Sequence, residues 1–180
     1  MKLFKIQKEV NLPQGLSIEC FKRKKNIFRL CFSGPLGKNI LDVPKGISIQ
    51  FKKKSLLLEV SSTFPKSKFK TFTRFIQQKC EGVHQGFKCS LQFRGVGYRH
   101  LLKDSYLDLR LGYSHPIQIP FQKDLQMVCP NPKTLFIKGV DCSQVHQKAA
   151  EIRSWRPPEP YKGKGIFYKD EQIVRKIGKI

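Results

Sequence analysis

Residues 134–152 read TLFIKGVDCSQVHQKAAEI, and within this stretch the hydrophobic period changes from that of a strand to that of a helix. The first part, Thr134–Val140, is a short apolar run typical of a strand. From about Asp141, the side chains of Val145, Ala149 and Ile152 recur on one face of a helix, which Trp155 or Arg156 would continue. The stretch therefore predicts a strand that leads directly into a helix.

The same order occurs in the first half of the chain. Ser55–Val60 is an apolar run, and it is followed by an apolar helical face at i, i+3, i+7 and i+11. Pro65 suits the first turn of this helix, and Gly82 lies just past its expected end. The residues of the apolar face are Phe69, Phe72, Ile76 and Cys80.

Short alternating runs broken by turn residues precede each helix, as in a meander of antiparallel strands. Strands followed by a helix, twice, predict an α+β protein of two tandem similar domains, each an antiparallel sheet with a helix on one face. We expect the domains at 1–81 and 82–180. The expected strands are about 10–12, 16–20, 26–32, 40–43, 47–51 and 55–60, then 86–93, 105–111, 117–121, 125–129 and 134–140.

Composition points to a polyanionic partner, because 35 Lys and Arg against 13 Asp and Glu give a net charge of +22. Six cysteines occur without a C-x-x-C pair, which favours reduced, buried thiols over zinc or disulfides. The N-terminus lacks an export signal, and no apolar run approaches the about 20 residues that cross a bilayer. Nucleic acid is therefore the leading candidate partner, with no membrane.

Residues 153–166, RSWRPPEPYKGKGI, predict an extended, proline-stiffened arm whose backbone is available to a partner. A solvated Pro-rich linker is the alternative. On the first interpretation Arg153, Arg156, Lys162 and Lys164 neutralise phosphates and Tyr161 stacks or packs, while Gly163 and Gly165 allow close approach of the backbone.

Gly95-Val96-Gly97 is not a dinucleotide fingerprint, since a third glycine at the right spacing is missing and no helix is expected there. We interpret it as a bend that brings Arg94, Tyr98 and Arg99 toward RNA. Cys80 and His84 have a spacing that would suit a shared metal only if the helix continued past Gly82. No Cys–His signature of nucleophilic catalysis is found. No metal, cofactor, small-molecule substrate or enzymatic activity is expected.

Two basic clusters, Lys22–Lys25 and Lys52–Lys54, fall in expected turns between strands. Such runs are usually solvated, but at a net charge of +22 contact with phosphates is at least equally supported. We expect these clusters to position an RNA rather than to specify its sequence.

Pro158–Ile166 and the residues around it resemble the C-terminal signature of the bacterial-type large-subunit ribosomal protein L-six family. Gly95–Arg99, Leu109–Pro116, Cys129-Pro130 and Leu135–Gly139 support the resemblance, which covers residues 82–171. Over residues 1–81 it is weaker and rests on the Pro13-x-Gly15 turn, Gly34-x-x-Gly37 and the strand order. The resemblance implies two similar α+β domains in a structural component of the large subunit.

The resemblance also implies binding to domain VI of the large rRNA near the sarcin–ricin and GTPase region, beside neighbouring ribosomal proteins. A free RNA-binding regulator or a nucleic-acid-processing enzyme is the competing hypothesis. The abundance of Phe, Lys and Ile, with alanine only at Ala149 and Ala150, is the bias expected of an organellar or otherwise AT-rich genome. Together with the resemblance and the expected absence of a transit peptide, this bias favours a mitochondrial member, with a plastid or AT-rich bacterial one as the alternative. The predicted rRNA-binding residues are Arg94, Gly95, Tyr98, Arg99, Ser114, His115, Arg153, Arg156, Tyr161, Lys162, Gly163, Lys164 and Gly165.

Overall fold

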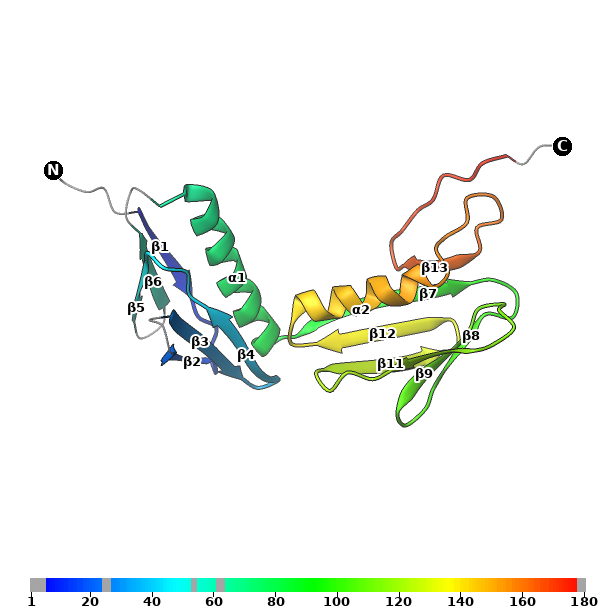
Figure 1. Ribbon diagram of the computed structural model, residues 1–180, viewed down its shortest axis with the longest axis horizontal. Helices are drawn as coiled ribbons and strands as arrows, with labels where there is room; N and C mark the ends of the chain where they lie inside the picture. Colours follow the sequence, from blue (N-terminus) through cyan, green and yellow to red (C-terminus); the bar gives the residue numbers. More distant parts are fainter. Residues whose placement is uncertain (1–5, 24–26, 53–54, 61–63, 178–180) are drawn as a thin grey trace. The chain divides into compact units, whose positions relative to one another are not determined.

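The structure, a computed structural model, describes residues 6–23, 27–52, 55–60 and 64–177. The chain divides into two compact units, Met1–Gly86 and Phe87–Ile180, each of which is described by itself. Each unit combines antiparallel sheets with one helix (Figure 1), which confirms the predicted α+β class with two similar halves. The division falls five residues after the expected boundary at 81/82.

Unit 1 contains two three-stranded antiparallel sheets, ordered β1-β6-β5 and β2-β3-β4. Every strand region expected in this half overlaps an observed strand. Alternation places Leu30 and Phe32 of one sheet and Leu56 and Leu58 of the other in the core, each fully buried. The strands are β1 Ile6–Asn11, β2 Ser17–Arg23, β3 Ile27–Gly34, β4 Gly37–Asp42, β5 Ile47–Phe51 and β6 Ser55–Val60.

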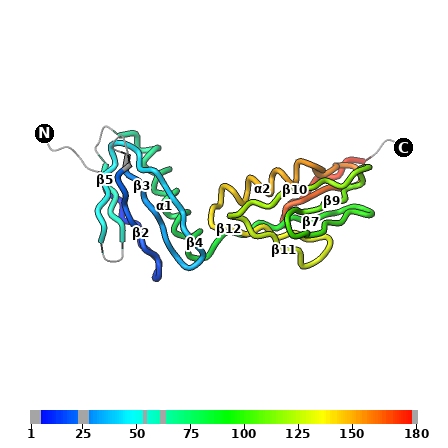
Figure 2. Tube along the Cα trace, turned by 60° about the horizontal axis from the view of Figure 1, so that its bottom comes forward, coloured from blue at the N-terminus to red at the C-terminus, as the bar shows by residue number. Residues whose placement is uncertain are grey.

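Helix α1, Lys66–His84, packs beside β3 and β4 (Figure 2), and all four residues of its predicted apolar face are buried. The expected end near Gly82 is wrong. Gly82 is a buried helical residue, and the helix continues to His84 with Gln85 as its C-cap. Gly86 follows, and its φ of +75° is the left-handed conformation typical of a glycine just past a helix end. Gly34 lies so close to α1 that a Cβ there would meet the Val83 side chain at 2.5 Å.

Unit 2 contains a three-stranded sheet ordered β10-β9-β8 and a four-stranded sheet ordered β11-β12-β7-β13. Each strand expected in this half is present. Strands β8 and β13 were not predicted. The strands are β7 Phe87–Arg94, β8 Arg99–Leu102, β9 Tyr106–Arg110, β10 Ile117–Pro120, β11 Leu125–Asn131, β12 Thr134–Gly139 and β13 Gly165–Tyr168.

Helix α2, Cys142–Ser154, begins after Asp141, whose side chain accepts a hydrogen bond from the Ser143 N–H as an N-cap. Val145, Ala149 and Ile152 are fully buried, as the spacing predicts. Neither Trp155 nor Arg156 continues that face within the helix, because the helix ends at Ser154.

The two units follow one plan. In each, the first strand pairs with the last strand before the helix (β1 with β6, β7 with β12), and the three strands after the first form a separate meander. Unit 2 adds β13 on the other edge of β7, where Gly165 pairs with Arg94 and Ile166 with Phe93. Within the described residues β1 remains an edge strand, so β13 is the main architectural difference between the units.

Strand β13 corrects the prediction of an open arm. The prolines of residues 153–166 lead into a closed loop, and the chain then returns to the sheet with Ile166 and Phe167 buried. The backbone of Gly165 to Tyr168 is paired on one side with β7, so it forms the edge of the sheet and not an open arm.

Burial of the thiols is also only partly as expected. Cys80 and Cys89 are buried, whereas Cys20 is exposed and the other three are intermediate. Burial raises the pKa of the Cys80 thiol to about 11, which makes it unreactive at neutral pH. In the described part of the chain, neither helix has the length and apolar character needed to cross a membrane.

Candidate nucleic-acid interface

The turn after β7 is organised by the ring of Tyr98. A Cβ on Gly95 would lie 2.7 Å from this ring, and one on Gly112, where φ is +78°, would lie 3.4 Å from it. The absence of a side chain at Gly95 therefore leaves the space that the ring occupies, whereas at Gly112 it is the positive φ that favours glycine. Tyr98 is only 7% exposed, so its role in this structure is to join the two turns rather than to present a free aromatic face.

Arg156, directly after α2, links this region to the β9–β10 loop. Its guanidinium lies 5.2 Å from the centroid of the Tyr113 ring. Hydrogen bonding to Tyr113, together with interaction with Tyr98, raises the pKa of Arg156. The Tyr113 hydroxyl in turn donates to the Trp155 carbonyl oxygen at 2.8 Å. The cation is thus held between two tyrosines at the point where the helix ends.

The loop from Pro157 to Lys164 is closed by its own backbone. The Glu159 N–H donates to the Lys164 carbonyl at 2.8 Å, and the Ile166 N–H donates to the Arg156 carbonyl at 2.9 Å. Gly165, at φ +139°, lies so close to Pro157 that a Cβ would meet its carbonyl oxygen at 2.7 Å. The glycine is needed for the chain to close on itself, which is the physical reason that the expected open arm does not form.

The C-terminal segment secures the outer side of this loop (Figure 1). The Lys176 N–H donates to the Pro160 carbonyl at 3.0 Å. The Arg175 guanidinium lies beside Gly163, where a Cβ would come within 3.0 Å of it. Gly163 therefore approaches an arginine of the same chain, and its φ of +65° favours glycine.

Arg153 has a partner within the protein. Its Nη2 donates to Glu171 Oε1 at 2.6 Å, its Nε donates to Glu171 Oε2 at 3.2 Å, and its guanidinium lies 5.4 Å from the Tyr168 ring centroid. Arg153 lowers the pKa of the Glu171 carboxyl, which also accepts from the Tyr168 N–H. The predicted phosphate ligand thus pins the end of β13 to α2.

Arg94 and Arg99 lie on β7 and β8. The Arg94 guanidinium lies 4.6 Å from the Phe167 ring centroid, and its Nη2 donates to Gln92 Oε1. Arg99 stands directly opposite Arg110 of β9, and both are exposed. Like charges facing each other across two strands are destabilising, and an anionic partner would relieve their repulsion.

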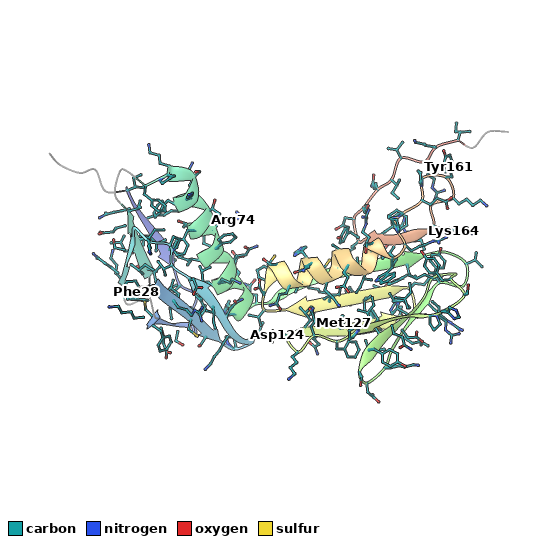
Figure 3. All side chains as sticks on the ribbon, in the orientation of Figure 1. Phe28, Arg74, Asp124, Met127, Tyr161 and Lys164 are labelled. Carbon is teal, nitrogen blue, oxygen red and sulfur yellow. The ribbon has the colours of Figure 1, made fainter. Side chains whose placement is uncertain are left out.

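Several predicted residues gather at this end of unit 2. Ser114 and His115 are exposed in the loop that carries Tyr113, while Tyr161 and Lys162 are exposed in the loop after α2. Figure 3 shows Tyr161 and Lys164 in that loop. We use the name loop surface for Tyr113, Ser114, His115, Trp155, Arg156, Tyr161, Lys162 and Lys164. Gly95, Tyr98, Arg153, Gly163 and Gly165 lie beneath or beside it as supports.

The model of the family described as Ribosomal protein L6 matches residues 94–169, the segment that holds this interface. A protein from Rubrobacter xylanophilus described as "Large ribosomal subunit protein uL6" is 41% identical over 94% of this chain and 94% of its own. A protein with the same description from Geobacter metallireducens is 41% identical over 96% of this chain and 95% of its own. One from Mycoplasmoides gallisepticum is 38% identical over 94% of this chain and 92% of its own.

This chain belongs to the uL6 family of ribosomal proteins. The family resemblance inferred from Pro158–Ile166 is therefore confirmed. The relatives align over both units, so membership of the uL6 family extends through unit 1, where sequence motifs gave little support.

Sequence reasoning missed three contributors to the candidate interface of this uL6 protein. Arg110 was not singled out because its position opposite Arg99 depends on strand register. Tyr113 stood in a recognised motif but became a candidate only through its contact with Arg156. Trp155 was expected on the buried helical face and is 45% exposed. The signal available in the sequence was the pair Trp155-Arg156 directly after the expected end of the second helix, which could have indicated an exposed aromatic side chain beside a cation.

Other predicted features fall outside this interface. Of the two basic clusters, Lys22 and Lys52 are exposed, and the Lys52 ammonium lies 3.4 Å from Glu9 Oε1. The side chains of the other cluster residues lie outside the part of the chain that the structure describes. The helix was expected to stop near Gly82, which argued against a metal shared by Cys80 and His84. Helix α1 does continue to His84, so that argument is wrong. Among the described residues, however, no third His, Cys, Asp or Glu joins them to hold a metal.

Proposed function

We propose that this protein is a structural constituent of the large ribosomal subunit, that it has no catalytic role, and that the loop surface of unit 2 binds large-subunit rRNA. Membership of the uL6 family supports the first part, since its relatives carry the description of large-subunit proteins. The net charge of +22 supports a nucleic-acid partner. The finer proposal, retained from the family resemblance, is a site in domain VI near the sarcin–ricin region, beside neighbouring ribosomal proteins.

The observation that carries the rRNA proposal is the position of Arg156. Its guanidinium is oriented by Tyr113 and Tyr98, so little side-chain entropy is lost when it contacts a phosphate. Lys162 and Lys164 supply two further cations on a loop whose backbone is already closed. Phosphate contacts of this kind fix the register of a protein on RNA without reading its sequence.

Exposed aromatic side chains accompany these cations. Tyr113, Trp155 and Tyr161 are 48%, 45% and 54% exposed. Flat side chains beside cations are suited to unpaired bases, which stack on aromatic rings in single-stranded RNA segments. The proposed site therefore combines phosphate neutralisation by Arg156, Lys162 and Lys164 with contacts to bases or sugars by the three aromatic residues.

Incorporation into ribosomes tests this proposal. The triple variant R156A/K162A/K164A is expressed in cells beside the wild-type protein, and its share in the large-subunit fraction of a sucrose gradient is measured. We expect a several-fold loss, because three phosphate contacts are removed together. The matched control is K66A/K68A/K70A on the exposed side of α1, which removes the same charge from unit 1 and is expected to incorporate normally. Equal incorporation of both variants would reject the loop surface as the rRNA site.

The same gradient tests the competing hypothesis of a free regulator or processing enzyme. Co-migration of nearly all of the wild-type protein with large subunits is expected, and a mainly free pool would contradict the structural role. For the location, we retain the mitochondrial ribosome as a proposal based on residue composition. The bacterial origin of the relatives supports a bacterial cytoplasmic ribosome as the second candidate. Gradients from purified organelles distinguish the two.

A further inference from the structure

The four-stranded sheet of unit 2 has a second face, which is turned away from the core. Side chains on this face follow the strand register, with Ser90 opposite Phe136 and Gln92 opposite Thr134. They line a groove of about 570 Å³ that continues to Lys169 at the end of β13. We call this hollow the sheet groove. All of its lining residues belong to unit 2, and none belongs to the loop surface.

The charge around the sheet groove favours an anion. Lys88 of β7 stands directly opposite Lys138 of β12, and both side chains are exposed. Two lysines in this position repel each other, at a cost that an anionic ligand would offset. Lys169 adds a third cation at the other side of the groove. Two carboxylates also line the groove. That of Glu171 is paired with Arg153, and that of Asp170 is exposed and offsets one of the three positive charges.

An aromatic face lies within this cationic setting. The Phe136 ring is partly exposed, and the Lys88 ammonium lies 3.7 Å from its centroid. A flat base can displace the ammonium from the ring, since both are attracted to the π-face. The released Lys88 ammonium would then be close to the phosphate of the same nucleotide.

The remaining lining suits a base and its sugar. Ser90 and Thr134 present hydroxyl groups that donate and accept hydrogen bonds. Gln92 Oε1 accepts from Arg94 Nη2 at 3.0 Å, which orients the amide and assigns its two donors to Nε2. The volume lies within the range of small-ligand sites.

We propose that the sheet groove binds one unpaired nucleotide of an RNA, with the base stacked on Phe136 and the phosphate between Lys88 and Lys169. The RNA is the rRNA of the proposed function, on which this inference rests for the identity of its partner. The groove thus makes a second contact with RNA, on a different face of unit 2 from the loop surface.

Binding of a fluorescein-labelled oligouridylate of ten nucleotides to the purified full-length protein tests this. Phe136→Leu keeps an apolar side chain in the strand but removes the flat ring. We expect it to weaken binding about 5- to 150-fold, the range of one base–aromatic stack. Phe136→Tyr keeps the ring and should retain the wild-type affinity. Phe75→Leu is the matched control, because Phe75 is a 44% exposed phenylalanine on α1, and it should change affinity less than twofold.

Two further measurements separate the groove from the loop surface. Phe136→Leu is repeated in the R156A/K162A/K164A background, where the same fold-change is expected. An oligouridylate with one 5-iodouridine is then photocrosslinked, and the peptide containing β12 should carry the RNA. If Phe136→Leu binds as tightly as the wild type, or if crosslinks occur only in the loop surface, the inference is overturned. If the Phe136 effect persists while the triple variant incorporates normally into ribosomes, the loop-surface proposal fails and the groove stands.

Discussion

Units 1 and 2 share a plan but differ in what is added to it. Unit 1 ends its sheet at β1, whereas unit 2 extends the equivalent edge, β7, with β13 and the closed loop before it. That addition brings Arg156, Tyr161, Lys162 and Lys164 to one end of the unit. A duplicated fold can thus acquire a distinct surface through one added strand, whose Ile166 side chain joins the core of the unit.

The exposed side chains of the two units differ accordingly. On the outer face of the β2-β3-β4 sheet of unit 1, Phe21 and Ile40 are about half exposed, and Arg29 is paired with Asp42. In unit 2 the exposed aromatic side chains Tyr113 and Trp155 lie next to Arg156. Cations beside aromatic rings suit RNA, so we assign the proposed RNA contacts to unit 2.

Removing the packing of β13, the strand that unit 1 lacks, should have the largest effect on stability. Ile166 is fully buried and pairs with Phe93, so Ile166→Ala is expected to lower the free energy of unfolding by about 3 kcal/mol through lost burial and the cavity left behind. Urea denaturation followed by circular dichroism measures the change. Val174→Ala, at a site 87% exposed, is the control and should cost less than about 0.5 kcal/mol. Equal stability of the two variants would show that β13 is not part of the folded unit.

A smaller effect is expected at the contact between the β9–β10 loop and the end of α2. Tyr113→Phe removes the hydroxyl that donates to the Trp155 carbonyl and that also hydrogen-bonds to Arg156, and it should cost about 1 kcal/mol of stability. The ring remains in place for Arg156. Thermal unfolding measures the loss, and an unchanged melting temperature would indicate that this hydrogen bond does not hold the loop in solution.

The smallest expected effect concerns the Arg153–Glu171 pair and depends on pH. The pKa of Glu171 is lowered in the folded protein, chiefly by Arg153, so its stabilising contribution is present above the unfolded value near 4.5 and disappears as the pH falls through the folded pKa. Glu171→Gln should cost about 0.5 kcal/mol at pH 7 for this partly exposed pair. The difference from the wild type should vanish near pH 3. Urea midpoints across this range test it, and a constant difference would contradict the pairing.

Much of the fold was predictable because it depends on local periodicity. Phe69, Phe72, Ile76 and Cys80 are all buried, as their helical spacing requires. The extent of α1 was misjudged because Gly82 resembles a terminator, yet it is a buried residue within the helix. Sequence alone does not distinguish this from Gly86, whose positive φ ends the helix.

Features that depend on contacts between distant residues were not predictable in the same way. Strand β13 follows a run of prolines, glycines and lysines that is typical of a loop, and it forms because it pairs with β7 far earlier in the chain. The burial of Tyr98 depends on Gly95, where a Cβ would clash with the ring, and on contact with the separate turn that contains Gly112. Most residues of the loop surface were therefore predicted as residue types, while Tyr113, Trp155 and the geometry of the surface came from the structure.

We claim that the RNA contacts lie in unit 2 rather than in unit 1, and the salt dependence of RNA binding tests this claim. The affinity for a transcript of the large-subunit rRNA is measured against salt concentration for the wild type, R156A/K162A/K164A in unit 2 and K66A/K68A/K70A in unit 1. We predict that the slope of log K against log salt falls by about 2 to 3 for the unit 2 variant, because each lost phosphate contact removes about 0.9. The slope should change by less than about 0.5 for the unit 1 variant, which removes the same charge but no predicted contact. Equal changes in the two variants would contradict the claim and assign the binding to net charge alone.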